Sequence, residues 1–197
     1  MAISAGLVKE LREKTGAGIM DCKKALQEND GDLEKAVEWL RKKGMASAKK
    51  RESRETKEGL IEAYIHPGNR IGVMIEVNCE TDFVAKNDEF KQFVRNMAMQ
   101  VAAANPLVVN REDLSPEQIE KEMNIYKEQA KNTGKPDHIL EKIAQGKLDK
   151  FYQEVCLMEQ SYIREPERPV ADVLSDVRAK IGENIKIKRF VRYQLGG

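Results

Sequence analysis

The stretch from Ile71 to Cys79 constrains the fold more than any other, because large apolar residues occupy every second position along it. Such alternation is the period of a β-strand that buries one face. Residues 60–65 are also β-prone, and the connection from His66 to Arg70 contains the proline and glycine of a tight turn. The pattern predicts a β-hairpin with one buried face.

Alternation returns at residues 185–195, after a long region in which apolar residues recur every three or four positions. We expect this late segment to be a third strand that pairs with the hairpin, because a two-stranded ribbon alone is marginally stable. The expected fold class is α+β, with an N-terminal three-helix bundle, a linker, and a three-stranded, largely antiparallel sheet covered by helices.

Three parts differ in composition along the chain. Residues 1–45 show helical periodicity and form the predicted bundle, whose core is thin. Residues 46–57 mix bases with acids and almost lack large apolar side chains, so we interpret them as a charged linker. Residues 58–197 form an α+β core domain with a helical insertion.

Caps and breakers locate the predicted helices. In the bundle, Ser4 caps the first helix, residues 15–18 break it, Asp32 caps the third, and Gly44 is placed to end it in a left-handed conformation. The core is expected to contain a helix from Asn87 to Asn105-Pro106, one from Ser115 toward Thr133-Gly134, one from Pro136 to Gly146, one over 148–158, a surface loop over 164–169 and a helix over 170–181.

Charge and composition limit the function classes. Of the 197 residues, 34 are Lys or Arg and 33 are Asp or Glu, so the net charge of +1 provides no field for a polyanion and argues against direct nucleic-acid binding. No apolar run approaches the roughly 20 residues that span a bilayer, and a signal-peptide core is missing. Three widely spaced cysteines fit reduced thiols. We expect a cytoplasmic protein without a membrane partner.

Motifs for catalysis are missing from the sequence. There is no P-loop or G-x-G-x-x-G run, and the two histidines lack metal-ligand spacing, so we expect no catalytic residue, no metal site and no cofactor. His66 could lie near Cys79 across the sheet and form a Cys-His nucleophile. The buried parity of Cys79 speaks against that enzyme, and we expect a protein that is not an enzyme.

The run from Asn78 to Asn87 joins the second strand to the following helix. Thr81 can cap a short helical turn, which places Phe83 on its first turn. A ring there either fills the core below or is offered to a partner, and spacing alone favours core packing.

Residues 7–26 and 76–87, in this order and spacing, resemble the elongation factor Ts family, and residues 190–193 resemble its ending. The resemblance covers essentially the whole chain. It implies the guanine nucleotide exchange factor of elongation factor Tu in bacterial-type translation, with that protein as partner, GDP-bound or nucleotide-free.

The resemblance also implies site residues. The family's first bundle is similar to ubiquitin-associated (UBA-like) domains and docks on the partner's GTPase domain. The matching positions here are Lys9, Thr15, Gly16, Ala17, Gly18, Met20 and Lys23. The central motif matches Thr81, Asp82, Phe83 and Val84. In the family, the aromatic ring pushes into the partner near its Mg²⁺ ion, so that GDP leaves faster. This implication favours an exposed Phe83, beside an Asp82 that fixes the turn or meets a donor on the partner.

Longer family members carry a second core half and an inserted helical hairpin, and this chain has room for one three-stranded half. Short members therefore imply a homodimer paired through the sheets. An RNA- or ribosome-binding module remains the alternative function. Its candidate phosphate contacts are Lys42, Lys43, Lys49, Lys50 and Arg51.

Overall fold

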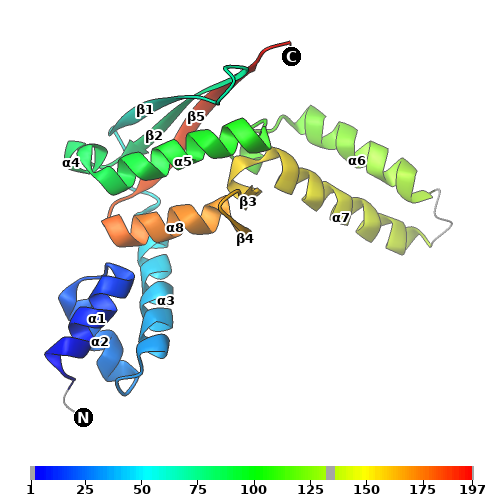
Figure 1. The fold of residues 1–197 in the computed structure, drawn as a ribbon. Helices are drawn as coiled ribbons and strands as arrows, with labels where there is room; N and C mark the ends of the chain where they lie inside the picture. Colours follow the sequence, from blue (N-terminus) through cyan, green and yellow to red (C-terminus); the bar gives the residue numbers. More distant parts are fainter. Residues whose placement is uncertain (1–2, 132–135, 197) are drawn as a thin grey trace. The chain divides into compact units, whose positions relative to one another are not determined.

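The computed structural model describes residues 3–131 and 136–196, which form two compact units (Figure 1). The first unit contains the residues up to 60 together with 78–93 and 172–186. The second contains 61–77, 94–171 and the chain from 187 on.

Three helices open the first unit: α1 (Ala5–Thr15), α2 (Ile19–Glu28) and α3 (Leu33–Arg51). The expected caps are confirmed, since the Ser4 hydroxyl accepts a hydrogen bond from the Leu7 N–H and the Asp32 carboxylate accepts one from the Lys35 N–H. The helices pack on one small apolar core. Its buried members are Val8, Leu11, Cys22, Ala25, Leu26, Ala36 and Leu40.

Helix α3 does not end at Gly44, so the predicted left-handed cap there is wrong. Ala36, Leu40 and Ala48 are buried at four-residue spacing, and Gly44 occupies the same stripe. A Cβ atom at Gly44 would lie 2.9 Å from the Cβ of Ala179, so glycine is required by close packing inside a continuing helix. The first part of the predicted linker is therefore helical, and residues 52–57 are irregular.

Three strands, β1 (Glu58–Ile65), β2 (Ile71–Cys79) and β5 (Ile185–Gln194), form an antiparallel sheet in the order β1-β2-β5. The predicted hairpin is confirmed, and its turn is closed by a hydrogen bond from the His66 N–H to the Ile71 carbonyl. Val73, Ile75 and Val77 are buried on β2, as their alternation predicts.

Two helices continue the chain after β2: α4 (Asp82–Lys86) and α5 (Asp88–Ala104). Helix α5 runs along the sheet (Figure 1). Its predicted inward stripe is confirmed, because Phe90, Phe93, Val94, Met97 and Val101 are all buried. Helix α8 (Val170–Ile181) precedes β5. The mixed α+β class is thus confirmed.

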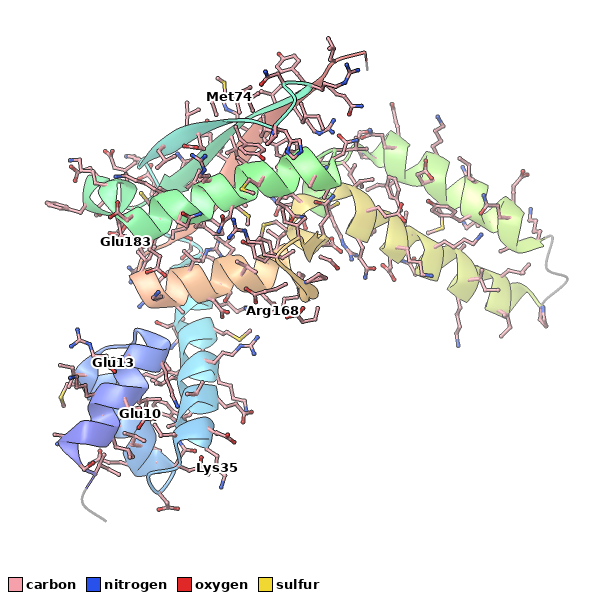
Figure 2. All side chains as sticks on the ribbon, in the orientation of Figure 1. Glu10, Glu13, Lys35, Met74, Arg168 and Glu183 are labelled. Atoms are coloured by element: carbon pink, nitrogen blue, oxygen red, sulfur yellow. The ribbon has the colours of Figure 1, made fainter. Side chains whose placement is uncertain are left out.

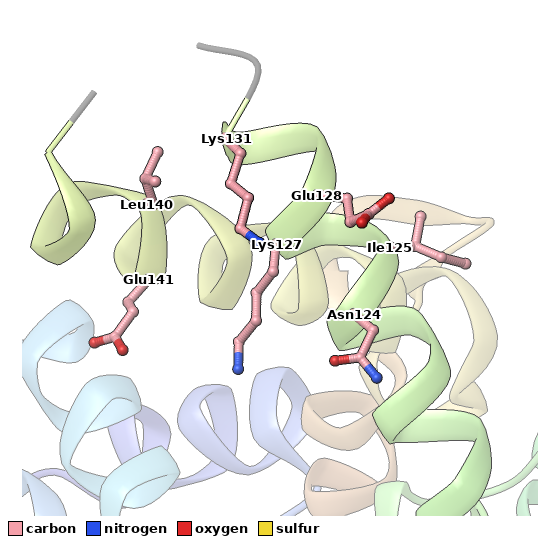
Figure 3. A pocket seen from close by; sticks show the side chains of 7 residues that line it. All are labelled: Asn124, Ile125, Lys127, Glu128, Lys131, Leu140 and Glu141. Carbon is pink, nitrogen blue, oxygen red and sulfur yellow. The ribbon is translucent and has the colours of Figure 1, made fainter. Parts of the chain in front are cut away.

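The second unit also contains a helical hairpin of α6 (Pro116–Lys131) and α7 (Asp137–Val155), flanked by the short helices η1 (Arg111–Asp113) and η2 (Leu157–Glu159). A core of Leu114, Leu148, Tyr152 and Cys156 holds its base together. A groove between the two helices is lined by Asn124, Ile125, Lys127, Glu128, Lys131, Leu140 and Glu141 (Figure 3). Helices α6 and α7 lie in the region where the sequence predicted a helical insertion in the core domain.

Two further expectations about this unit are wrong. Helix α7 runs through Gly146, because Ala144, Leu148 and Tyr152 form one buried stripe across that position. The expected surface loop over 164–169 contains strand β4 (Glu165–Pro169), which pairs antiparallel with β3 (Ser161–Tyr162). The break expected at Thr133-Gly134 lies outside the described residues.

Candidate partner-binding site

The turn that carries Phe83 is short and built from local hydrogen bonds. The Thr81 hydroxyl accepts from the Val84 N–H at 3.4 Å, which confirms the predicted cap of α4. The Asn87 side chain then accepts from the Glu89 N–H at 2.8 Å and starts α5. Helix α4 therefore lies between strand β2 and helix α5, with a side-chain cap at its start and another where α5 begins.

Helix α4 has no buried residue, and the Phe83 side chain is 81% exposed. Spacing alone had favoured packing of this ring in the core, and that expectation is wrong, because the ring does not fill the core of its own chain. An exposed phenylalanine gives up the roughly 1.5–3 kcal/mol that its burial would provide. Its place on a braced turn makes it available to another surface.

Asp82 pairs with Lys86 one helical turn later, at 2.6 Å. The hydrogen bond from the Lys86 ammonium lowers the pKa of the Asp82 carboxyl below its ordinary value, and the same bond raises the pKa of Lys86. Both side chains are exposed, so the pair orients the turn and adds little stability.

A second set of contacts joins this turn to the loop after α8. The Glu183 carboxylate accepts hydrogen bonds from the Glu80 N–H and the Thr81 N–H, each at 3.1 Å, and from the Thr81 hydroxyl at 2.6 Å. Glu80 returns the contact, since its carboxylate accepts from the Asn184 N–H at 2.6 Å. Figure 2 labels Glu183 beside α4.

Asn184 connects the same loop to the end of α3. Its side chain is fully buried, and its amide nitrogen donates to the carbonyls of Glu52 at 3.2 Å and Arg54 at 2.8 Å. Arg54 also pairs with Glu80, at 3.3 Å. The turn of Phe83 is thus tied by polar contacts to the chain that leaves the N-terminal bundle.

The loop between α1 and α2 has a defined geometry as well. Gly16 has φ +67° and donates to the Arg12 carbonyl at 2.7 Å, so it closes α1 in the left-handed region. Thr15 donates its hydroxyl to the Leu11 carbonyl and accepts from the Ala17 N–H. Gly18 then precedes α2, and its carbonyl accepts from the Cys22 N–H at 2.9 Å.

This loop lines one side of a groove of about 360 Å³. Thr15, Gly16, Ala17 and Gly18 are all among its lining residues, so the structure brings these four predicted residues together. Arg41 and Arg51 of α3 and Lys180 of α8 are among the cations on its walls, and Asp21 and Asp176 are the acids.

The other predicted residues of the bundle lie outside that groove. Met20 is 74% exposed on the first turn of α2, next to Ile19, which is 54% exposed. Lys23 is exposed on the same helix. Lys9 is exposed on α1 and pairs with Glu13 at 3.8 Å. Met20 and Lys23 thus form a small apolar and basic surface of α2.

The thiol that the sequence offered as a nucleophile is buried. Cys79 has no exposed surface and donates to the Thr81 carbonyl at 3.2 Å, and burial raises its pKa to about 11. A protonated, enclosed thiol is a poor nucleophile. Within residues 3–131 and 136–196 there is also no cluster of three metal-ligating side chains. In the same part of the chain, no helix combines the length and apolarity that crossing a bilayer requires.

Two families of known proteins match this chain and together cover its whole length. The family described as "Elongation factor TS" matches residues 45–197, and that described as "Elongation factor Ts, mitochondrial, N-terminal" matches residues 1–48. The chain belongs to the elongation factor Ts family. This membership makes it a translation elongation factor.

Curated elongation factor Ts relatives match this family member over nearly their whole length. The one from Thermoanaerobacter sp. (strain X514) is 58% identical over 98% of this chain and 95% of the relative. The one from Carboxydothermus hydrogenoformans is 59% identical over 98% of this chain and 89% of the relative. The one from Thermodesulfovibrio yellowstonii is 56% identical over 100% of this chain and 98% of the relative.

Sequence reasoning missed Glu80, Glu183 and Asn184, which hold the turn of Phe83. Their contacts join positions more than 100 residues apart, so no local pattern reveals them. One weak signal exists, because Glu183 is an acid just beyond the C-terminus of α8, where the helix dipole favours a cation.

Proposed function

We propose that this chain binds elongation factor Tu and accelerates the release of GDP from it, without making or breaking a covalent bond. In this proposal Phe83 enters the partner's GTPase domain near its bound Mg²⁺, with Thr81, Asp82 and Val84 forming the turn that presents the ring. Displacing the ion removes charge neutralisation from the phosphates of GDP, which then leaves faster. We place this activity in the cytoplasm.

The observation that carries the proposal is the exposure of Phe83 on a turn fixed at both ends. An exchange factor accelerates release only through contacts that are stronger in the nucleotide-poor state of its partner. A rigid ring can supply such a contact, because little side-chain entropy is lost when it docks.

The N-terminal bundle would provide a second contact. Met20 is flexible and exposed, and Lys23 and Lys9 can pair with acids at the rim of an interface. The loop of Thr15, Gly16, Ala17 and Gly18 keeps the backbone close to the surface, because three of the four residues have no side chain or only a methyl group. We propose that this surface docks on the GTPase domain of elongation factor Tu.

We also propose that two chains pair through their sheets. The strands carry an unusual number of exposed apolar side chains, which suits an interface. They are Ile61 (63% exposed), Ile65 (60%), Met74 (49%), Val191 (40%) and Tyr193 (71%). A dimer would supply the second core half that longer family members carry within one chain.

The test of the exchange function is the release of fluorescently labelled GDP from elongation factor Tu after addition of excess unlabelled GDP. The Phe83 side chain is 81% exposed, and burying a phenylalanine side chain is worth roughly 1.5–3 kcal/mol. Only the part of this contact energy that is stronger in the nucleotide-poor state of the partner accelerates release. We therefore expect Phe83→Ala to slow GDP release between about tenfold and a hundredfold at limiting concentration.

The matched control is Leu107→Ala, which removes another exposed apolar side chain (58% exposed) outside the proposed contacts. It should exchange GDP like the wild type. If Phe83→Ala also did so, the exchange mechanism proposed here would be refuted.

The alternative function, binding of RNA or the ribosome, predicts affinity that falls steeply with salt. Its candidate bases are partly engaged within the chain, since Lys42 pairs with Glu38 at 2.7 Å and Lys43 with Asp21 at 2.6 Å. Measuring RNA binding at two salt concentrations separates the two functions.

A further inference from the structure

The Glu183 carboxylate has more hydrogen bonds to the turn before α4 than any other side chain described there. One oxygen accepts from two successive backbone N–H groups, those of Glu80 and Thr81, and the other accepts from the Thr81 hydroxyl. An ionised carboxylate has about four acceptor sites, so three of them are used within the chain. Glu183 is therefore not free to bind a partner strongly itself.

These bonds act at the point where the chain leaves β2. Thr81 is the cap of α4, and its hydroxyl both donates to Glu183 and accepts from the Val84 N–H. Because Phe83 lies between Thr81 and Val84, the direction of its ring depends on the cap. Helix α4 buries none of its residues, so packing of its own side chains does not fix that direction.

The loop that holds Glu183 is anchored in turn. Asn184 is fully buried and fixed by the Glu80 carboxylate on its N–H and by two backbone carbonyls on its side chain. Arg178 further ties this region to the segment after α3, through Glu52 at 2.8 Å and the Ile185 carbonyl at 2.7 Å. Glu183 thus lies on a loop that is held by several hydrogen bonds, and it contacts a turn whose following helix, α4, has no buried residue.

We propose that Glu183 is the positioning residue of the exchange site: it holds the Thr81 cap so that Phe83 points at the partner. This role rests on the proposed exchange function. Glu183 acts through the ring, so its loss should lower the rate of GDP release only while the ring is present.

The test is a double-mutant cycle in the GDP-release assay with full-length chain at limiting concentration. We expect Glu183→Ala to slow release about tenfold, the factor that corresponds to losing one or two charge-assisted hydrogen bonds at a partly exposed site. In the Phe83→Ala background, the same substitution should have almost no further effect.

Glu183→Gln keeps one oxygen that can accept from the two N–H groups, so it should recover most of the activity. Glu62→Ala is the control, because Glu62 also forms a partly buried ion pair, with Arg95 at 3.6 Å, in the second unit. In the free chain, amide hydrogen exchange of Glu80 and Thr81 should become faster in Glu183→Ala while the circular dichroism spectrum stays unchanged.

Two results would overturn the role of Glu183 alone: wild-type activity of Glu183→Ala when Phe83→Ala is impaired, or an equal further loss in the Phe83→Ala background. If Glu183→Ala did not fold, an activity of Glu183→Gln as low as that of Phe83→Ala would likewise contradict it. Wild-type activity of Phe83→Ala would instead refute the exchange mechanism itself, and with it this role.

Discussion

Asn184 offers a stability prediction whose sign follows from hydrogen-bond geometry. Its amide nitrogen faces two carbonyl oxygens, those of Glu52 and Arg54, in a fully buried site. Its amide oxygen has no hydrogen-bond partner. The Asn184 side chain is therefore needed as a hydrogen-bond donor, and its amide oxygen adds no hydrogen bond to the stability of the fold.

Two substitutions separate these properties. Asn184→Ala loses two hydrogen bonds at about 1 kcal/mol each, so we expect the free energy of unfolding to fall by about 2 kcal/mol. Asn184→Asp keeps the shape but turns a carboxylate oxygen toward both carbonyls. Burying that charge without a donor, or protonating it, should cost about 4 kcal/mol.

Urea unfolding at neutral pH measures both effects. Trp39 is the only tryptophan, and it packs against the bundle core in the same unit, so its fluorescence reports on unfolding there. Asn124→Asp is the control, because Asn124 is exposed on α6 and should tolerate the change. An Asn184→Asp variant as stable as Asn184→Ala would refute the assignment of the side chain as a buried donor.

Two other predictions concern the sheet and the thiols. Ile61→Lys should shift a dimer toward monomer in sedimentation velocity, because the lysine charge would be buried in the proposed interface, whereas Leu107→Lys, at another exposed apolar position, should not. A wild-type chain that is monomeric at micromolar concentration would remove the dimer. Burial raises the pKa of Cys79 and Cys156 from 9.0 to about 11, so the unfolded chain loses these protons first as the pH rises. The free energy of unfolding should therefore fall between pH 9 and pH 11, by up to about 1.4 kcal/mol per pH unit for each thiol, and this fall should be smaller in Cys79→Ala. If the free energy of unfolding, measured by urea titration, fell equally with pH in Cys79→Ala and in the wild type, the contribution of the buried Cys79 thiol would be refuted.

Local chemistry was predictable from sequence. The caps at Ser4, Asp32 and Thr81 each join a side-chain oxygen to an N–H three residues later, so the residues that decide the structure stand together in the chain. The hairpin was predictable for the same reason, because turn residues and alternation are local signals.

The errors arose where packing overrides a local preference. Glycine is a poor helix former, yet α3 continues through Gly44, which lies within a buried stripe, and α7 continues through Gly146, because its buried stripe extends on both sides of that position. The exposure of Phe83 was not predictable from spacing either. A ring on the first turn of a five-residue helix can point either way, and family resemblance supplied the correct expectation.

The unbroken course of α3 has a practical consequence for dissecting this protein. A fragment cut after residue 45 would end inside a helix, with its last carbonyls unpaired and without Ala48, which is buried. A fragment that ends at residues 55–57 would retain the whole helix, and the cut would fall in irregular backbone before β1. Low stability of the shorter fragment would then reflect the place of the cut, and only the longer one reports what the bundle can do by itself.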